Sequence, residues 1–304
     1  MGDKELVTNQ NLMEKIEYQN KGFPLSFYED HLDDYLNGEM GYHWHDDLEF
    51  SMVLQGEARY FIHHGGTEQE CEVMKEGEAI FVNYQYLHKV IQTKPGTVMF
   101  TLVLPVDFFA FLPMGEIHKR NILPVIQSAV AGLFLKEEEK ESQPLLNSIR
   151  RMHSLSRESV GYELHCMELI CRLWRQLLIR ISKIQGLPPA SKTERQQEQR
   201  LRRMLSYIHE HYGEKISIQS LTESANISRS ECFRCFRSIG KTPSEYLCQY
   251  RLSQAAYFLT YTDRTISDIC FSCGFKSMSY FGKLFRENCG MSPGQYRKNG
   301  MRGQ

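Results

Sequence analysis

The sequence of 304 residues lacks long apolar runs, and no stretch approaches the roughly 18 consecutive apolar residues that a membrane-spanning helix needs. Its first thirty residues are polar and charged, without the apolar segment of a secretory signal. It also lacks the even, regular cysteine spacing of a secreted disulfide framework, because nine cysteines are scattered through apolar, helix-like patterns. We therefore expect a cytoplasmic protein with free thiols and no membrane partner.

Net charge is nearly absent too, at −1 for the whole chain, but the charges are unevenly distributed. Residues 192–304 contain 18 Lys and Arg against 10 Asp and Glu, a net charge of +8, whereas residues 1–191 have a net charge of −9. Clustered cationic side chains bind nucleic acid well because binding releases counterions from the phosphates. The charge distribution therefore favours a polyanionic partner for the C-terminal part.

The hydrophobic pattern divides the chain into a β-rich part and a helical part, so the predicted fold class is α+β. Residues ~20–110 contain short Val-, Ile-, Phe- and Tyr-rich segments broken by turns, as in an antiparallel barrel or sandwich. Apolar residues then recur at helical spacing in one stripe, which consists of Met167, Ile170, Cys171, Trp174, Leu177, Leu178 and Ile181. Residues 185–197 contain Pro, Gly and polar residues and are the natural linker to a helical C-terminal part.

The C-terminal part repeats itself with a period of about 49 residues. Each copy predicts a short helix, a tight turn and a second helix. Ser217 and Thr265 can cap the first helices, and Ser228 and Ser277 can cap the second helices. A long helix over 244–262 joins the copies and would hold them apart at a fixed distance. Two such helix-turn-helix units can enter successive major-groove segments about 34 Å apart on one face of DNA.

The segment ISDICFSCGFKSMSYFGKLFRENCGMSPGQYR, residues 266–297, resembles the signature of AraC/XylS-family transcriptional regulators. The first copy of the repeat agrees with the same family, so the resemblance covers residues 194–298. It departs from the family at Cys232, where Leu is usual, and at Phe233, where a polar residue is usual. The resemblance implies a sequence-specific transcriptional regulator rather than an enzyme, with double-stranded DNA, RNA polymerase and a second copy of the chain as partners.

The outward residues of each second helix are the candidates for base and phosphate contact, since the inward residues belong to the core. Arg234 is the first candidate, because its guanidinium fork can donate to O6 and N7 of one guanine. Ser279 and Lys283 occupy positions that read bases in similar proteins, and Gly282 leaves room for close approach. The full set is Arg229, Ser230, Phe233, Arg234, Arg237, Met278, Ser279, Tyr280, Lys283 and Arg286. The alternative is that these cations form only a solvated face.

Two Cys-x2-Cys pairs have the ligand spacing of a four-thiolate zinc site. They are Cys232 with Cys235 and Cys270 with Cys273. Each pair falls at helix-core positions where the other copy of the repeat has residues such as Phe, Leu, Thr or Ala. We therefore predict four small buried side chains rather than zinc ligands.

The segment GYHWHDDLEFSMVLQG, residues 41–56, brings His43, His45 and Glu49 close together, and His88 follows as a fourth candidate ligand. The pattern resembles the two motifs of the cupin barrel. On a strand, residues 43, 45 and 49 point to the same side, which would be the lumen if Phe50, Met52 and Leu54 pack outside. This geometry permits a divalent metal held by His43, His45, Glu49 and His88.

The second cupin motif is incomplete, because Asn83, Gln85 and Gln92 replace its usual Pro, Gly and Asn. Regulators of the AraC/XylS family carry a similar barrel that senses an effector, so the main prediction is a site without cofactor that binds a small polar ligand such as a sugar. The candidate effector-binding residues are His43, His45, Glu49, Tyr84, Tyr86 and His88. A metal-dependent cupin enzyme is the first alternative, and a barrel that serves only for dimerisation is the second.

The predicted organisation has four parts. Residues 1–125 would form a cupin-like effector-sensing barrel, and residues 126–184 a helical dimerisation region. Residues 185–197 would be the linker, and residues 198–304 a DNA-binding domain with two helix-turn-helix units.

Overall fold

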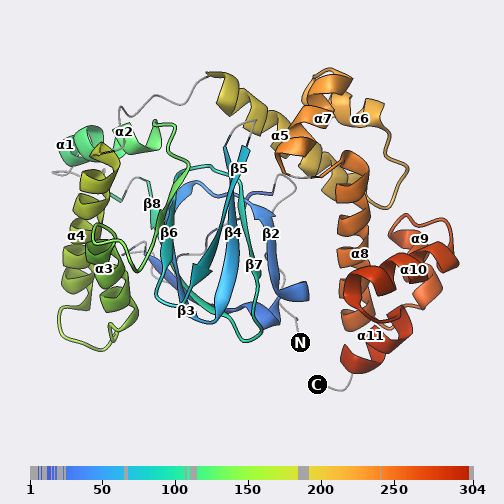
Figure 1. The fold of residues 1–304 in the computed structure, drawn as a ribbon, viewed down its shortest axis with the longest axis horizontal. Helices are drawn as coiled ribbons and strands as arrows, with labels where there is room; N and C mark the ends of the chain where they lie inside the picture. The colour runs from blue at the N-terminus through green and yellow to red at the C-terminus, as the bar shows by residue number, and fades with distance from the viewer. Residues whose placement is uncertain are drawn as a thin grey trace.

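The computed structural model describes residues 25–64, 68–106, 108–109, 115–183, 192–239 and 241–300, together with residues 6, 8, 12–14, 16, 18 and 23. Two β-sheets stand in the middle of the molecule, with a helix pair on one side and the helical C-terminal part on the other (Figure 1). The α+β class predicted from the sequence is confirmed. Within the described residues, every helix is too short or too polar to serve as a membrane span.

The two sheets are built from strands that pair antiparallel with each of their neighbours. The first sheet, in the order β1-β8-β3-β6-β9, contains β1 (Ser26–His31), β3 (Asp47–Gln55), β6 (Ala79–Val82), β8 (Val98–Pro105) and β9 (Gly132–Leu135). The second, in the order β2-β7-β4-β5, contains β2 (Glu39–His43), β4 (Glu57–His64), β5 (Glu68–Lys75) and β7 (His88–Gln92). Two 3-10 turns, η1 (Leu32–Asp34) and η2 (Leu36–Gly38), connect β1 to β2.

Side chains of β3 alternate between two cores, because successive residues of a strand point to opposite faces. Phe50 and Met52 are fully buried in the core that the five-stranded sheet shares with the helix pair, and Leu54 packs against it. Val53 belongs instead to the core between the two sheets. The prediction that Phe50, Met52 and Leu54 pack outside is confirmed, so Glu49 and Ser51 face inward.

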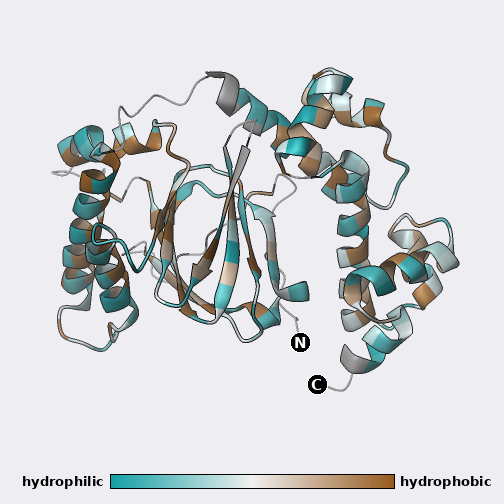
Figure 2. Cartoon of the chain, viewed as in Figure 1, coloured by the Kyte–Doolittle hydropathy of each residue, from teal (hydrophilic) through white to brown (hydrophobic). Residues whose placement is uncertain are grey.

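The helix pair covers the outer face of the five-stranded sheet. It consists of α3 (Gln143–His153) and α4 (Tyr162–Ser182), preceded by α1 (Gly115–Ile117), the π-helix η3 (His118–Ile122) and α2 (Leu123–Ile126). Ile170, Trp174, Leu177 and Ile181 of α4 are buried against the sheet, as the stripe predicted. Cys171, which we placed in the stripe, is exposed, because it lies on the outward flank of the helix. Hydrophobic residues are concentrated in the strands and on one side of the helices (Figure 2).

The C-terminal part consists of seven described helices. They are α5 (Lys192–His211), α6 (Ile218–Ala225), α7 (Arg229–Ser238), α8 (Pro243–Tyr261), α9 (Ile266–Ser272), α10 (Met278–Cys289) and α11 (Pro293–Gly300). The predicted linker 185–197 overlaps α5, because the stretch that follows Lys192 is rich in Glu, Gln and Arg, which favour helix. Residues 185–191 lie outside the described residues.

Candidate nucleic-acid interface and buried polar cluster

Both copies of the repeat fold as two helices joined by a tight turn. Ser217 and Ser228 begin α6 and α7, each with a reciprocal capping box in which side chains and backbone N–H groups satisfy one another. Thr265 and Ser277 accept backbone N–H groups at the start of α9 and α10. The four predicted caps are confirmed, which is why short helices with few residues begin at defined positions.

The two turns rely on different left-handed residues. Asn226 ends α6 with φ 53°, a conformation that Asn tolerates better than most side chains. Gly274 follows α9 with φ 81°, and a Cβ there would lie 2.6 Å from the carbonyl oxygen of Tyr212. Only Gly fits the second turn, because both the backbone angle and the close approach exclude a side chain.

The four cysteines that imitate a zinc site lie in two different cores. Cys232 and Cys235 pack with Phe236 in the first unit, whereas Cys270 and Cys273 pack with residues of the second unit. Burial raises the pKa of the Cys232 and Cys273 thiols to about 11, which disfavours the thiolate that zinc requires. The prediction that the four side chains are buried is confirmed.

The outward faces of α7 and α10 carry the predicted contact residues. Phe233 is half-buried, and the remaining members are exposed: Arg229, Ser230, Arg234 and Arg237 in α7, and Met278, Ser279, Tyr280, Lys283 and Arg286 in α10. Tyr280 is 57% exposed and Met278 39%. Large apolar groups that project from a helix in this way suit contact with thymine methyl groups.

The charged groups of α7 are arranged so that its arginine side chains remain free to contact a partner. Glu231 lies 2.9 Å from Nη1 of Arg200 and 3.6 Å from Nη2 of Arg234, so its shorter ion pair is with α5. The ion pair of Arg234 is therefore long, and about half of the Arg234 side chain is exposed to solvent. The Arg229 guanidinium lies 5.9 Å from the centre of the Phe233 ring, and Phe233 thus supports a neighbouring cation.

A buried polar cluster lies between the two sheets, where Glu49 receives hydrogen bonds from several strands. Nε2 of His45 lies 2.9 Å from Oε2 of Glu49, and Nε2 of His88 lies 3.3 Å from the same oxygen. The hydroxyls of Ser51 and Tyr60 donate to Oε1 at 2.6 Å and 2.7 Å. Sequence reasoning missed Ser51 and Tyr60. Ser51 follows Glu49 by two residues and shares its face, but Tyr60 gave no local signal.

Two histidines of the cluster are oriented by backbone carbonyl groups. Nδ1 of His43 donates to the carbonyl of Gly41 at 2.8 Å, and Nδ1 of His88 donates to the carbonyl of Tyr86 at 2.8 Å. The second nitrogen of each ring, Nε2, is thus left to face the cluster. Burial, with the nearby His88, holds the pKa of His43 well below its usual range.

The Glu49 carboxylate and the His45 imidazole form a buried ion pair. Burial acts to raise the pKa of Glu49, but His88 and His45 hold that pKa well below its ordinary value. Burial also acts to lower the pKa of His45, but its hydrogen bond to Glu49 raises it. Each group thus stabilises the charged form of the other.

One atom each from His43, Glu49 and His88 lie within 4.8 Å of one another, close enough to surround a metal ion. His45, which we predicted as a fourth ligand, is not part of this group, and its Nε2 lies against Oε2 of Glu49. The donor set suits a divalent transition metal. However, protein groups already bond both oxygens of Glu49, so a metal would have to displace them.

The remaining sequence candidates, Tyr84 and Tyr86, pack against two different cores, Tyr86 against the one between the sheets. The Tyr84 hydroxyl accepts a bond from Nε2 of Gln85 at 2.8 Å, and the Tyr86 hydroxyl lies 3.4 Å from the carbonyl of Ser128. Both tyrosines are half-buried. Asn83 donates to the carbonyls of Val125 and Val130 and so fixes a connecting loop.

Comparison with known proteins gives matches over both parts of the chain. A helix-turn-helix domain family matches residues 221–299. The chain is 28% identical over 298 residues to the uncharacterized HTH-type transcriptional regulator YdeC of Bacillus subtilis, with 97% of this chain and 99% of that protein covered. It is 23% identical over 260 residues to the melibiose operon regulatory protein of Escherichia coli strain K12, with 84% and 83% covered.

Among solved structures, a probable AraC family transcriptional regulator from Rhodopseudomonas palustris is 28% identical to the chain. The match covers 33% of this chain and 96% of that one, with a TM-score of 0.32.

Proposed function

The chain belongs to the AraC/XylS family of transcriptional regulators, and on this premise we propose that α7 and α10 read a specific double-stranded DNA site under the control of a small effector. The observation that carries the proposal is the pair of capped second helices, each with a row of exposed cationic and polar side chains. Phosphate contacts would come from the basic residues, and base contacts from the residues nearest the groove floor.

The length of α8 supports the simultaneous contact of both helix-turn-helix units with one DNA duplex. Its 19 residues extend about 28 Å at 1.5 Å per residue. Successive major-groove segments on one DNA face are about 34 Å apart. A stiff helix of this length between the two units would let both enter the same face.

The N-terminal part is proposed to be a cupin-like effector-sensing barrel, residues 1–125, followed by a dimerisation region, residues 126–184. A relative is named for the melibiose operon, which supports a sugar as effector. Leu164 on α4 is 78% exposed, and such an apolar residue suits an interface with a second copy. Residues 198–304 would then bind DNA in the cytoplasm, with RNA polymerase as a further partner.

A metal-dependent cupin enzyme is the less favoured function. The relatives are regulators rather than enzymes, and the polar cluster can be satisfied without a metal. We propose that the cluster supports the barrel or binds the effector and catalyses no reaction.

Arg234→Ala should weaken binding to a selected DNA site by about 1–3 kcal/mol and relax the preference at one base pair, because one bidentate base contact is lost. The site would be selected from random duplexes with the full-length protein, and affinities compared at one salt concentration. Arg172→Ala is the matched control, because Arg172 is an exposed arginine on α4. An Arg234→Ala protein with unchanged affinity and profile would remove Arg234 from the interface, and a wild-type protein that selects no duplex would overturn the function itself.

A further inference from the structure

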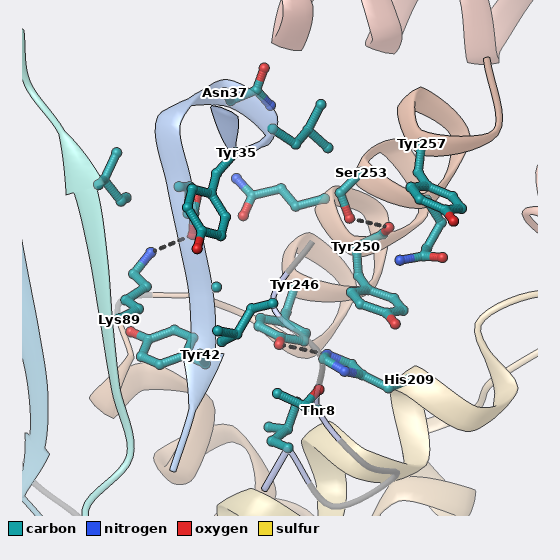
Figure 3. A pocket seen from close by; sticks show the side chains of 18 of the residues that line it. Thr8, Tyr35, Asn37, Tyr42, Lys89, His209, Tyr246, Tyr250, Ser253 and Tyr257 are labelled. Atoms are coloured by element: carbon teal, nitrogen blue, oxygen red, sulfur yellow. Dashed lines mark hydrogen bonds and ion pairs between the residues drawn. The ribbon is translucent and has the colours of Figure 1, made fainter. Parts of the chain in front are cut away.

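A cavity of about 450 Å³ lies between the β-rich part and the C-terminal helices (Figure 3). Tyr42 and Lys89 line it from the four-stranded sheet, and Tyr246, Tyr250 and Tyr257 line it from α8. No residue that the sequence nominated for effector or DNA binding is among its lining residues in the described part of the chain. A cavity of this size is typical of sites for small molecules.

The two parts of the chain hold each other firmly beside the cavity. Tyr42 and Leu87 of the β-rich part share one buried core with Leu205 and Phe236 of the DNA-binding part. Nε2 of His63 in β4 lies 2.6 Å from the Ser238 hydroxyl at the end of α7. A ligand in the cavity would therefore contact both parts next to the place where they already pack against each other.

The walls of the cavity carry more positive than negative charge. Nζ of Lys89 lies 3.1 Å from Oε1 of Glu39, and Lys89 is itself almost fully buried. Lys241 has no ion pair among the described residues, and its Nζ lies 5.7 Å from the centre of the Tyr246 ring. Burial first, and then the charge of Lys89, lowers the pKa of Lys241. Burial lowers the pKa of His209 to about 3, so this imidazole is neutral.

The rest of the lining offers aromatic faces and groups that both donate and accept hydrogen bonds. The tyrosine rings supply flat apolar surface, and Asn37, Gln249 and Ser253 supply amides and a hydroxyl. Aromatic faces beside such polar groups suit a molecule with many hydroxyls. Glu39 is the acidic residue among the described lining residues, so the two ammonium groups leave one positive charge over, which suits a single anionic group.

We propose that this cavity, and not the polar cluster between the sheets, binds the effector, and that the effector is a hydroxylated anion the size of a phosphorylated sugar. The proposal rests on the proposed function, because it takes the ligand to be what controls DNA binding. The anionic group would lie between Lys89 and Lys241, and thus between the sensing part and the reading part.

A ligand in this position can control the two reading units. Much of α8, the helix that joins them, lines the cavity, and Lys241 lies two residues before the start of that helix. A ligand that contacts both parts stabilises this arrangement of the two parts relative to other arrangements. It shifts the population toward this arrangement by the difference between its affinities for the two.

The test uses the full-length protein with several hexoses, each beside its phosphate ester, and inorganic phosphate as a further probe. Thermal unfolding and affinity for the selected DNA site would be followed at constant ionic strength. We expect a phosphate ester to raise the unfolding midpoint and change DNA affinity more than the parent sugar. Lys241→Met should weaken that ligand by at least about tenfold, as the loss of one charge-assisted hydrogen bond implies. Lys215→Met, at an exposed lysine, is the matched control and should respond as wild type.

A Glu49→Gln variant distinguishes the two candidate sites. The cavity proposal requires that Glu49→Gln keep the response and that Lys241→Met lose it. The reverse pattern would place the effector in the polar cluster, and equal responses to sugar and ester, or none at millimolar concentrations, would also overturn the cavity proposal. Selection of a DNA site by the untreated protein tests the proposed function separately, so the two failures cannot be confused.

Discussion

Replacing Glu49 with Ala should lower the free energy of unfolding by about 3–5 kcal/mol, because it leaves a buried cation without its partner. Glu49 is 5% exposed and receives Nε2 of His45, while the hydroxyls of Ser51 and Tyr60 bond its other oxygen. Removing the carboxylate leaves these donors buried without an acceptor, and water cannot take the place of the carboxylate unless the site rearranges. Chemical denaturation of the full-length protein measures the loss.

Glu49→Gln is the matched control for this prediction. The amide keeps the shape of the side chain and one acceptor oxygen, so its loss of stability should be clearly smaller than that of Glu49→Ala. Unfolding in the presence of a chelator adds a second comparison. A wild-type midpoint that falls sharply on chelation, or a Glu49→Ala protein as stable as wild type, would contradict the hydrogen-bonded cluster as the source of stability.

Phe281→Ala should destabilise the second reading unit by about 3–5 kcal/mol, since it empties the centre of a closely packed core. Phe281 is fully buried, with ring centres 5.0 Å from Phe275 and 5.5 Å from Phe285. Because that core fixes α10 against α8 and α9, binding to the selected DNA site should weaken together with stability. Thermal unfolding and DNA titration of the same preparation measure both effects.

Tyr280→Ala separates structure from contact at the neighbouring position. Tyr280 projects from α10 and is 57% exposed, so its removal should leave the unfolding midpoint within about a degree or two of wild type, as for surface substitutions. Its effect should appear in DNA affinity alone. Equal losses of stability in the two variants would show that α10 is not packed as described.

Local periodicity was enough to predict much of the structure of the C-terminal part from the sequence alone. The caps at Ser217, Ser228, Thr265 and Ser277 and the buried cysteines followed from spacings of three and four residues, which a helix converts directly into faces. The same rule gave the exposed rows of α7 and α10. It overstated the apolar stripe at Cys171 and placed the start of the helical part too late, because flank positions and helix ends depend on neighbours.

Strand periodicity predicted only some of the residues of the polar cluster. The prediction placed His43, His45 and Glu49 on one strand, but His43 ends β2 of the four-stranded sheet and Glu49 lies in β3 of the five-stranded sheet, with His45 between the two strands. They meet because the chain crosses from one sheet to the other there, and the register that pairs His43 with His88 adds the fourth residue. Tyr60 comes from β4 of the four-stranded sheet, and its hydroxyl reaches Glu49 only because that sheet packs against the five-stranded sheet. The positions of Tyr84 and Tyr86 could not be predicted either, because they follow Asn83, whose amide is held by the distant carbonyls of Val125 and Val130.

The sequence by itself determined the charge division, the repeat and the identity of the outward residues, because each depends on residues a few positions apart. Tertiary structure alone decided the cavity, whose walls come from segments as distant as Tyr42, Lys89, Lys241 and Asn288. Contacts between such segments form only when packing of the whole chain offsets the entropy of bringing them together. No local pattern encodes that balance, so Lys241 gave no signal until the two parts were seen in contact.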